Sequence, residues 1–190
     1  MHKRKVILVG VGGGLAYGNL GPTHHSFEDL SLMSILPNMS VYSPSQPSES
    51  KESLKLAIEN RDPSYIRLGK NGEPDLSKFM VEKYNDISIY NKKIDQTDML
   101  VLTYGAITYE CVLAGEIIKD KAKFSIASIL RLKPIPENLL EMCMCFKKIL
   151  IVEEHSTFNS PGTHIISKLS MSGFKGEINM IGIDDKFTDE

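Results

Sequence analysis

The sequence predicts an α/β protein made of two tandem three-layer αβα units with mostly parallel sheets, of which the first is incomplete. Short β-rich apolar runs alternate along the chain with amphipathic stretches, a pattern that is typical of βαβ crossovers. The first run, Lys5–Val9, is almost continuously apolar and ends in glycines, as a buried parallel strand does. A turn-rich stretch at 69–80 interrupts the alternation and separates the two units.

The predicted strands are short runs of apolar and β-branched residues that end at glycines, prolines or polar turns. In chain order they cover Lys5–Val9, Ser40–Ser43, Ser64–Leu68, Ile87–Tyr90, Met99–Thr103, Phe124–Ile129, Ile149–Glu153 and Ile178–Ile183.

The predicted helices carry apolar residues three or four positions apart, which places those residues on one face. In the first helix Phe27, Leu30 and Met33 form such a stripe, and Pro37 ends the helix. Pro47 occupies the first turn of the second helix, where proline is tolerated. In chain order the helices cover His25–Leu36, Pro47–Asn60, Ala106–Lys119, Pro136–Phe146 and Pro161–Met171.

A domain boundary near residue 78 divides the chain into residues 1–78 and 79–190. The first unit supplies about three strands and two helices. A parallel sheet this narrow leaves apolar edges uncovered. We therefore expect the first unit to need another chain, or sequence that precedes residue 1.

Composition excludes several classes of function. Lys and Arg number 22 against 24 Asp and Glu, so the net charge of −2 gives no basic footprint for nucleic acid. The longest apolar runs, such as Val6–Val9 and Ile149–Val152, are far shorter than the roughly 20 residues that span a bilayer. No secretory signal is expected, and three cysteines without metal-like spacing predict reduced thiols and a cytoplasmic location.

The glycine run Gly10–Gly14 follows a strand but does not fit a nucleotide-binding fingerprint. The third glycine of the fingerprint falls on Leu15 in one frame and on Tyr17 in the other. We expect a flexible glycine loop that leads to a helix about ten residues later, without a phosphate cradle of a familiar type.

Two residues are candidates for binding a substrate. Thr23 is a possible N-cap, which would place His24 at a helix N-terminus on the edge where α/β sheets bind ligands. His24 would then hydrogen-bond a substrate hydroxyl or move a proton, or it is a solvated cap residue. Arg67 lies in the apolar strand Ser64–Leu68 and needs an anionic partner. That partner is a substrate phosphate or carboxylate, or an internal salt bridge, and the residues leave both open.

Other titratable groups point to structure more than to chemistry. Cys143 and Cys145 are expected in a core or an interface. Glu153, Glu154 and His155 end a strand, where they are expected to line a subunit contact. His155 and His164 lack further ligands at fixed spacing, so we expect no metal site.

Several motifs resemble those of transketolases. The pyrimidine-binding domain of that family is similar to Gly18–Leu30 (GNLGPTHHSFEDL), Leu36–Val41 (LPNMSV) and Pro63–Leu68 (PSYIRL). The family's C-terminal domain is similar to Thr103–Ile107 (TYGAI), Leu132–Pro136 (LKPIP) and Val152–His155 (VEEH). The resemblance makes 1–78 the C-terminal half of a pyrimidine-binding domain and 79–190 a transketolase C-terminal domain.

The resemblance implies a thiamine diphosphate-dependent enzyme that moves a two-carbon ketol unit between sugars or sugar phosphates. Such enzymes also use a divalent metal, Mg²⁺, and bind the cofactor between a diphosphate-binding domain and the pyrimidine domain of a partner subunit. The family's metal motif and its cofactor-activating glutamate do not occur in this sequence. The resemblance therefore implies an N-terminal, diphosphate-binding partner subunit, a homodimer through the C-terminal domain, and an isolated chain that is inactive.

The resemblance assigns two site residues. His24 matches the GPTH histidine that contacts substrate hydroxyls near the reacting carbon, and Arg67 matches an arginine that binds the sugar phosphate. The family's acidic residue before GPTH is Leu20 here, and its phosphate-binding histidine is Gly12. These departures imply a less phosphorylated or modified acceptor sugar.

Two alternatives share parts of this pattern. Deoxyxylulose-phosphate synthases and the β subunits of 2-oxoacid dehydrogenases have the same cofactor and domain order, although GPTHH and LPNM favour transketolase. A non-catalytic assembly module that only binds a partner subunit is the third possibility.

Overall fold

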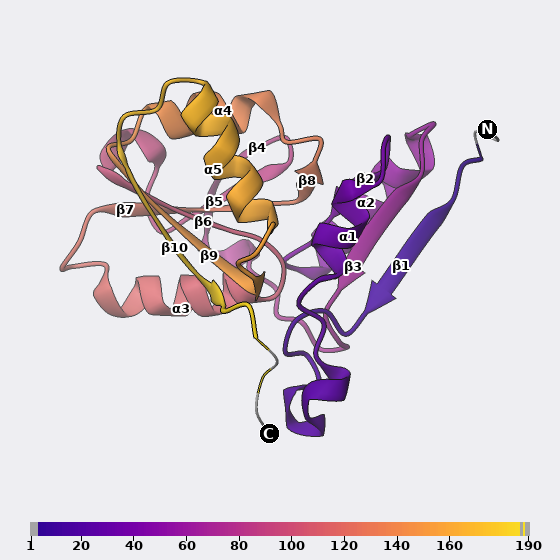
Figure 1. Ribbon diagram of the computed structural model, residues 1–190. Coiled ribbons are helices and arrows are strands. Elements are labelled where there is room, and N and C mark those ends of the chain that lie inside the picture. The colour runs from indigo at the N-terminus through magenta and orange to yellow at the C-terminus, as the bar shows by residue number, and fades with distance from the viewer. Residues whose placement is uncertain (1–3, 187, 189–190) are drawn as a thin grey trace.

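The computed structural model describes residues 4–186 and 188. Two β-sheets lie side by side, the smaller one formed mainly by the first part of the chain and the larger one by the rest (Figure 1). Both sheets are mostly parallel and carry helices, so the predicted α/β fold class is confirmed. No helix among the described residues is both long enough and apolar enough to cross a membrane.

The smaller sheet has the strand order β1-β3-β2-β8. Its strands are β1 (Ile7–Val11), β2 (Ser40–Tyr42), β3 (Ser64–Leu68) and β8 (Arg131–Lys133). The first three strands are parallel, and β8 runs antiparallel to β2. Helices α1 (Asp29–Ile35) and α2 (Pro47–Glu59) cover opposite faces, because Leu30 packs with Tyr65 while Ala57 packs with Ile66.

The larger sheet has the strand order β10-β9-β6-β7-β5-β4. Its strands are β4 (Met80–Tyr84), β5 (Ile87–Tyr90), β6 (Met99–Thr103), β7 (Phe124–Ile129), β9 (Lys148–Ser156) and β10 (Glu177–Ile183). The four strands from β10 to β7 are parallel, and β5 and β4 add an antiparallel edge.

Three helices sandwich this larger sheet. They are α3 (Ile107–Ile118), α4 (Glu137–Met144) and α5 (Pro161–Met171). Val112 of α3 packs with Val101 on one face, whereas Leu139 of α4 and Ile165 of α5 pack with Leu100 on the other. Successive residues of a strand point to opposite faces, so the layers are α3, sheet, then α4 with α5.

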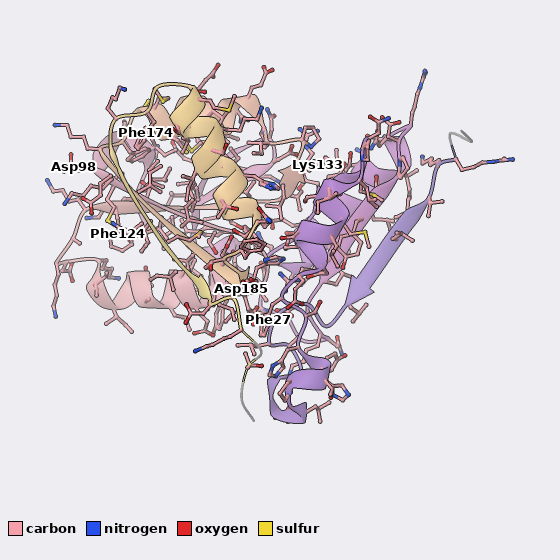
Figure 2. All side chains as sticks on the ribbon, viewed as in Figure 1. Phe27, Asp98, Phe124, Lys133, Phe174 and Asp185 are labelled. Atoms are coloured by element: carbon pink, nitrogen blue, oxygen red, sulfur yellow. The ribbon has the colours of Figure 1, made fainter. Side chains whose placement is uncertain are left out.

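Strand β8 and the main core join the two sheets. β8 follows β7 in sequence, yet it extends the smaller sheet through pairs such as Val41 with Lys133. Lys133 also donates hydrogen bonds to the carbonyls of Ser34 and Leu36 at the end of α1 (Figure 2). The main apolar core likewise contains residues from both sheets. The residues after the predicted boundary therefore help to build the first sheet.

Most predicted elements are found, and five of them have the predicted bounds: β3, β5, β6, β7 and α5. Strands β4 and β8 are additional to the prediction. β4 is a half-exposed strand of mixed polarity, and β8 has three residues of which two are charged, so neither carries an apolar signal.

The first helix begins later than predicted, at Asp29 instead of His25. His25 has an extended backbone, and Ser26 pairs with Gly14 in a β-bridge, so a helix cannot start there. The predicted N-cap role of Thr23 is wrong: its hydroxyl lies 3.1 Å from Nδ1 of His24. The prediction that His24 sits at a helix N-terminus is also wrong, because it lies in a 3-10 turn, Pro22–His24.

The outer edge of the smaller sheet is uncovered, as the sequence predicts. Val9 and Val11 of β1 are 51% and 63% exposed, and β1 pairs only with β3 among the described strands. All three cysteines are free, in line with the expected reduced thiols. Cys143 lies in the main core, whereas Cys145 is exposed.

Candidate functional site

The carboxyl ends of parallel strands from both sheets meet at one junction. Gly105, just after β6, donates its backbone N–H to the carbonyl of Ser43, just after β2, at 3.1 Å. Arg67 at the end of β3 reaches the carbonyl of Glu154 on β9 at 3.1 Å. Ligands of open α/β sheets bind outside the carboxyl ends of the strands, so this junction is the candidate site.

Arg67 is committed to protein oxygens in this junction. Its side chain is 7% exposed, and Nη2 donates to the carbonyl of Ser26 at 2.7 Å as well as to that of Glu154. Nε lies 3.6 Å from Oδ2 of Asp29, which also accepts a 2.7 Å hydrogen bond from the hydroxyl of Tyr65. Of the two partners left open by the sequence, the structure contains the internal salt bridge. Burial and the Asp29 carboxylate raise the pKa of Tyr65, so its hydroxyl stays a donor at neutral pH.

A second buried network lies just beyond the end of β6, against β9. The hydroxyl of Tyr104 donates to Oε2 of Glu153 at 2.8 Å, and the backbone N–H of Gly162 donates to the same oxygen at 3.0 Å. Glu153 therefore fixes the first turn of α5 to the sheet. Burial raises the pKa of Glu153, because the charged form loses hydration, and it raises the pKa of Tyr104 for the same reason.

His155 lies on the same face of β9 as Glu153 and is fully buried. Its Nδ1 lies 2.8 Å from the carbonyl of Ser156, which can only accept, so Nδ1 carries the proton. Burial lowers the pKa of His155 and favours the neutral ring. The expectation of a subunit contact is wrong for Glu153 and His155, since both side chains are enclosed within the chain. For Glu154, which is only partly buried, it stays a prediction.

The glycine run crosses directly over Arg67 and Glu154. A Cβ at Gly13 would overlap Nε of Arg67, and a Cβ at Gly14 would overlap the carboxyl group of Glu154. Gly14 also has φ +64°, in the left-handed region that favours glycine. The run therefore serves close packing over the junction, which explains why it does not follow a nucleotide-binding pattern.

The junction encloses only a small cavity, of about 10 Å³. Its lining comes from the glycine run, the ends of β2, β3 and β9, and the residues after β6: Gly13, Ser43, Pro44, Arg67, Gly69, Tyr104, Gly105, Ala106 and Glu154. A cavity of this size holds about one water molecule.

His24 lies away from this cavity, in a loop of residues 15–25. The β-bridge between Gly14 and Ser26 closes the loop through two backbone hydrogen bonds, with N···O distances of 2.8 and 3.1 Å. The loop extends beyond both sheets, below them in the view of Figure 1. The side chain of His24 is exposed, and the cavity that Arg67 lines does not include it. The convergence of His24 and Arg67 on one pocket stays a prediction.

Two larger grooves flank the junction. One, of about 520 Å³, lies beside the start of α2 and the turn after β3, and Lys51 and Lys70 line it. The other, of about 620 Å³, lies between α1 and the end of β10, with Phe27 and Asp185 among its lining residues (Figure 2). These two lysines were not singled out from the sequence: Lys51 lies within the predicted helix Pro47–Asn60, and Lys70 follows the predicted strand Ser64–Leu68.

The partners of Arg67 were also missed. Asp29 lies in the motif stretch Gly18–Leu30, but sequence distance does not show that it meets Arg67. Tyr104 follows β6 and Glu153 lies within β9, and these two strands become neighbours only through the sheet order β9-β6.

Comparisons with known proteins identify the family. The model of the transketolase pyrimidine-binding domain matches residues 1–73, and that of the transketolase C-terminal domain matches residues 90–188. One subunit of the apulose-4-phosphate transketolase of Phocaeicola vulgatus is 28% identical over 191 residues, which cover 97% of this chain and 59% of that protein. The 1-deoxy-D-xylulose-5-phosphate synthase of Dechloromonas aromatica is 28% identical over 184 residues, covering 93% and 28%.

A solved structure agrees in fold. A split-gene transketolase, described as an inactive β4 tetramer, superimposes with a TM-score of 0.77 at 24% identity, covering 97% of this chain and 59% of that one. The chain thus spans about three fifths of the subunit-type relatives that it matches. With matches to two transketolase domains in the family's order, the chain belongs to the transketolase family.

Proposed function

We propose that this chain is the C-terminal section of a split, thiamine diphosphate-dependent transketolase that transfers a two-carbon ketol unit between sugars or sugar phosphates. One observation carries the proposal: 97% of the chain aligns with a relative that is itself named as a subunit of a transketolase. The division into 1–78 and 79–190 belongs to this proposal, and the two domain matches lie on either side of it. A cytoplasmic location is also part of this proposal, and the three free cysteines favour it.

The junction by itself does not fit the cofactor, and the described residues do not fit the metal. The junction cavity of about 10 Å³ cannot contain thiamine diphosphate. The described residues bring together no set of three His, Cys, Asp or Glu side chains suited to a metal ion. We therefore assign thiamine diphosphate and Mg²⁺ to a diphosphate-binding partner subunit, and derive no reaction step from either. When bound, the thiamine group would supply the nucleophile and the electron sink.

His24 and Arg67 have separate roles in this proposal. The imidazole of His24 is exposed on the loop of residues 15–25, where it can hydrogen-bond a sugar hydroxyl presented by a partner subunit. Arg67 would bind an anionic group of the acceptor only after the glycine run moves, because Gly13 covers its guanidinium. Association through the C-terminal domain, as a homodimer, completes the proposed assembly.

Activity measurements on the assembled enzyme test the proposal. Ketol transfer is measured with thiamine diphosphate and Mg²⁺ for the chain alone, for a co-expressed diphosphate-binding subunit alone, and for the mixture. We expect activity only in the mixture. Replacing His24 by Ala is expected to lower kcat/KM roughly 10²-fold or more. His164→Ala, at an exposed histidine on α5, is the matched control and is expected to leave activity unchanged.

Three results would contradict parts of the proposal. Ketol transfer by the chain alone would overturn the need for a partner. Full activity of the His24 variant would remove that residue from the site. Co-purification of the two subunits without any activity would favour a non-catalytic assembly module.

The similarity to 1-deoxy-D-xylulose-5-phosphate synthase supports a second candidate activity. That enzyme class, like the 2-oxoacid dehydrogenases, uses an oxoacid donor such as pyruvate. Comparing a ketose donor with pyruvate in the mixed enzyme separates the candidates, and we expect turnover with the ketose.

A further inference from the structure

We infer that Glu154, a residue of the C-terminal unit, is the positioning residue of the loop of residues 15–25 that carries His24. The geometry of the junction supports this inference, and it rests on the proposed function only for what the loop does.

Glu154 holds the loop at its neck. Its Oε1 accepts a hydrogen bond from the backbone N–H of Leu15 at 2.7 Å, although the two residues are 139 positions apart. The carboxyl group also packs against Gly14, where no side chain larger than hydrogen would fit. Leu15 is the first residue after the Gly14–Ser26 bridge, so the contact acts where the loop leaves the sheets.

The backbone of Glu154 is fixed at the same place. Its carbonyl accepts from Nη2 of Arg67, and the same nitrogen donates to the carbonyl of Ser26 on the other side of the neck. The next residue but one, Ser156, donates its N–H to the carbonyl of Phe27 at 2.9 Å. Strand β9 thus contacts both sides of the neck, and the carboxylate of Glu154 is the group of this strand that accepts the N–H of Leu15.

This arrangement gives the C-terminal unit a direct part in the proposed site. The Gly14–Ser26 bridge closes the loop at its neck. The hydrogen bond that the Glu154 carboxylate of strand β9 accepts from Leu15 adds a contact that orients the loop where it leaves the sheets. The loop and its exposed histidine are therefore oriented by a residue that lies in the other unit.

Amide hydrogen exchange on the complete chain tests this inference without any assay of activity. The variants are Glu154→Ala, which removes the acceptor, and Glu154→Gln, which keeps an oxygen at the same position. We expect exchange at Leu15 to rise about tenfold or more in the Ala variant and to stay within about threefold of wild type in the Gln variant. Glu154→Asp, whose shorter side chain withdraws the carboxylate from the N–H of Leu15, is expected to reproduce the Ala variant.

Glu73→Ala is the matched control. Glu73 accepts the N–H of Lys70 at 3.1 Å in another exposed turn, so its loss should free that amide and leave Leu15 unchanged. Exchange in β6 and β7 reports whether each variant remains folded. If Glu154→Ala unfolds the chain, Glu154→Asp decides.

Two results would overturn the inference. One is unchanged protection of Leu15 in folded Glu154→Ala or Glu154→Asp. The other is equal loss of protection in the Gln and Ala variants, because the acceptor oxygen is present in the former. Neither result depends on whether the chain takes part in ketol transfer.

Discussion

Replacing Arg67 by Ala tests whether this residue is primarily a tie between the two units. The change removes two hydrogen bonds from a charged donor, at 2.7 and 3.1 Å, and leaves Asp29 without its cationic partner. Both side chains of the ion pair are largely buried, with exposures of 7% and 15%. Removing one member of a buried pair costs about 3–5 kcal/mol in the free energy of unfolding.

Urea denaturation and thermal melting measure this loss. For a chain of this size, about 3–5 kcal/mol corresponds to a fall in Tm of about 6–20 °C. Arg67→Lys keeps the charge but cannot reach all three oxygens, so we expect a smaller loss. Arg61→Ala, at an exposed arginine in the turn before β3, is the matched control and should change stability by about 0.5 kcal/mol or less.

The ion pair itself is isolated by adding Asp29→Asn. The double variant has no unpaired carboxylate. The losses of the two single variants should therefore add up to more than the loss of the double variant. A loss for Arg67→Ala as small as that of the Arg61 control would refute the reasoning. It would mean that the guanidinium is not committed to the protein and is available to a ligand.

Three further predictions concern the buried polar groups. Tyr104→Phe removes one of two donors to Glu153 and should lower the free energy of unfolding by about 1–3 kcal/mol; an unchanged urea midpoint would contradict this. Ser88→Ala leaves Oε1 of buried Glu49 without its 2.8 Å donor and should cost a similar amount, whereas a neutral effect would show that water replaces the hydroxyl. The pKa of His155 is lowered in the folded chain, so as the pH drops through about 6.5 the unfolded state binds a proton that the folded state does not. The free energy of unfolding therefore decreases as the pH decreases. His155→Gln should therefore lose less stability than wild type between pH 7 and pH 5 in parallel urea titrations, and an identical pH dependence would exclude this role.

The fold could be predicted where each element carries its own signal. β3, β6 and β7 are short runs rich in apolar and β-branched residues between turns, and α5 begins at a proline after Ser160, whose hydroxyl accepts the N–H of Thr163. β8 could not be predicted, because it is held by its pairing with β2 and not by its own residues. The start of α1 was misplaced for a similar reason, since Ser26 pairs with Gly14.

The candidate site was predictable only in part. His24 and Arg67 were selected because of their residue types and positions, and the predicted need of Arg67 for a partner is confirmed by Asp29. The identity of that partner was not predictable, since three carbonyl and carboxylate oxygens from different segments surround the guanidinium. No sequence motif explains the glycine run. It lacks side chains because Arg67 and Glu154 pack directly against its backbone.

The sequence by itself determined the fold class, the order of most elements and the family, because apolar periodicity and short motifs are local properties of the chain. The tertiary structure alone decided that the C-terminal unit supplies a strand to the first sheet, and that Glu154 and Arg67 hold the loop that carries His24. These contacts join residues that are tens to more than a hundred positions apart. Their formation depends on which strand ends become neighbours, and that is fixed only when both sheets pack on one core.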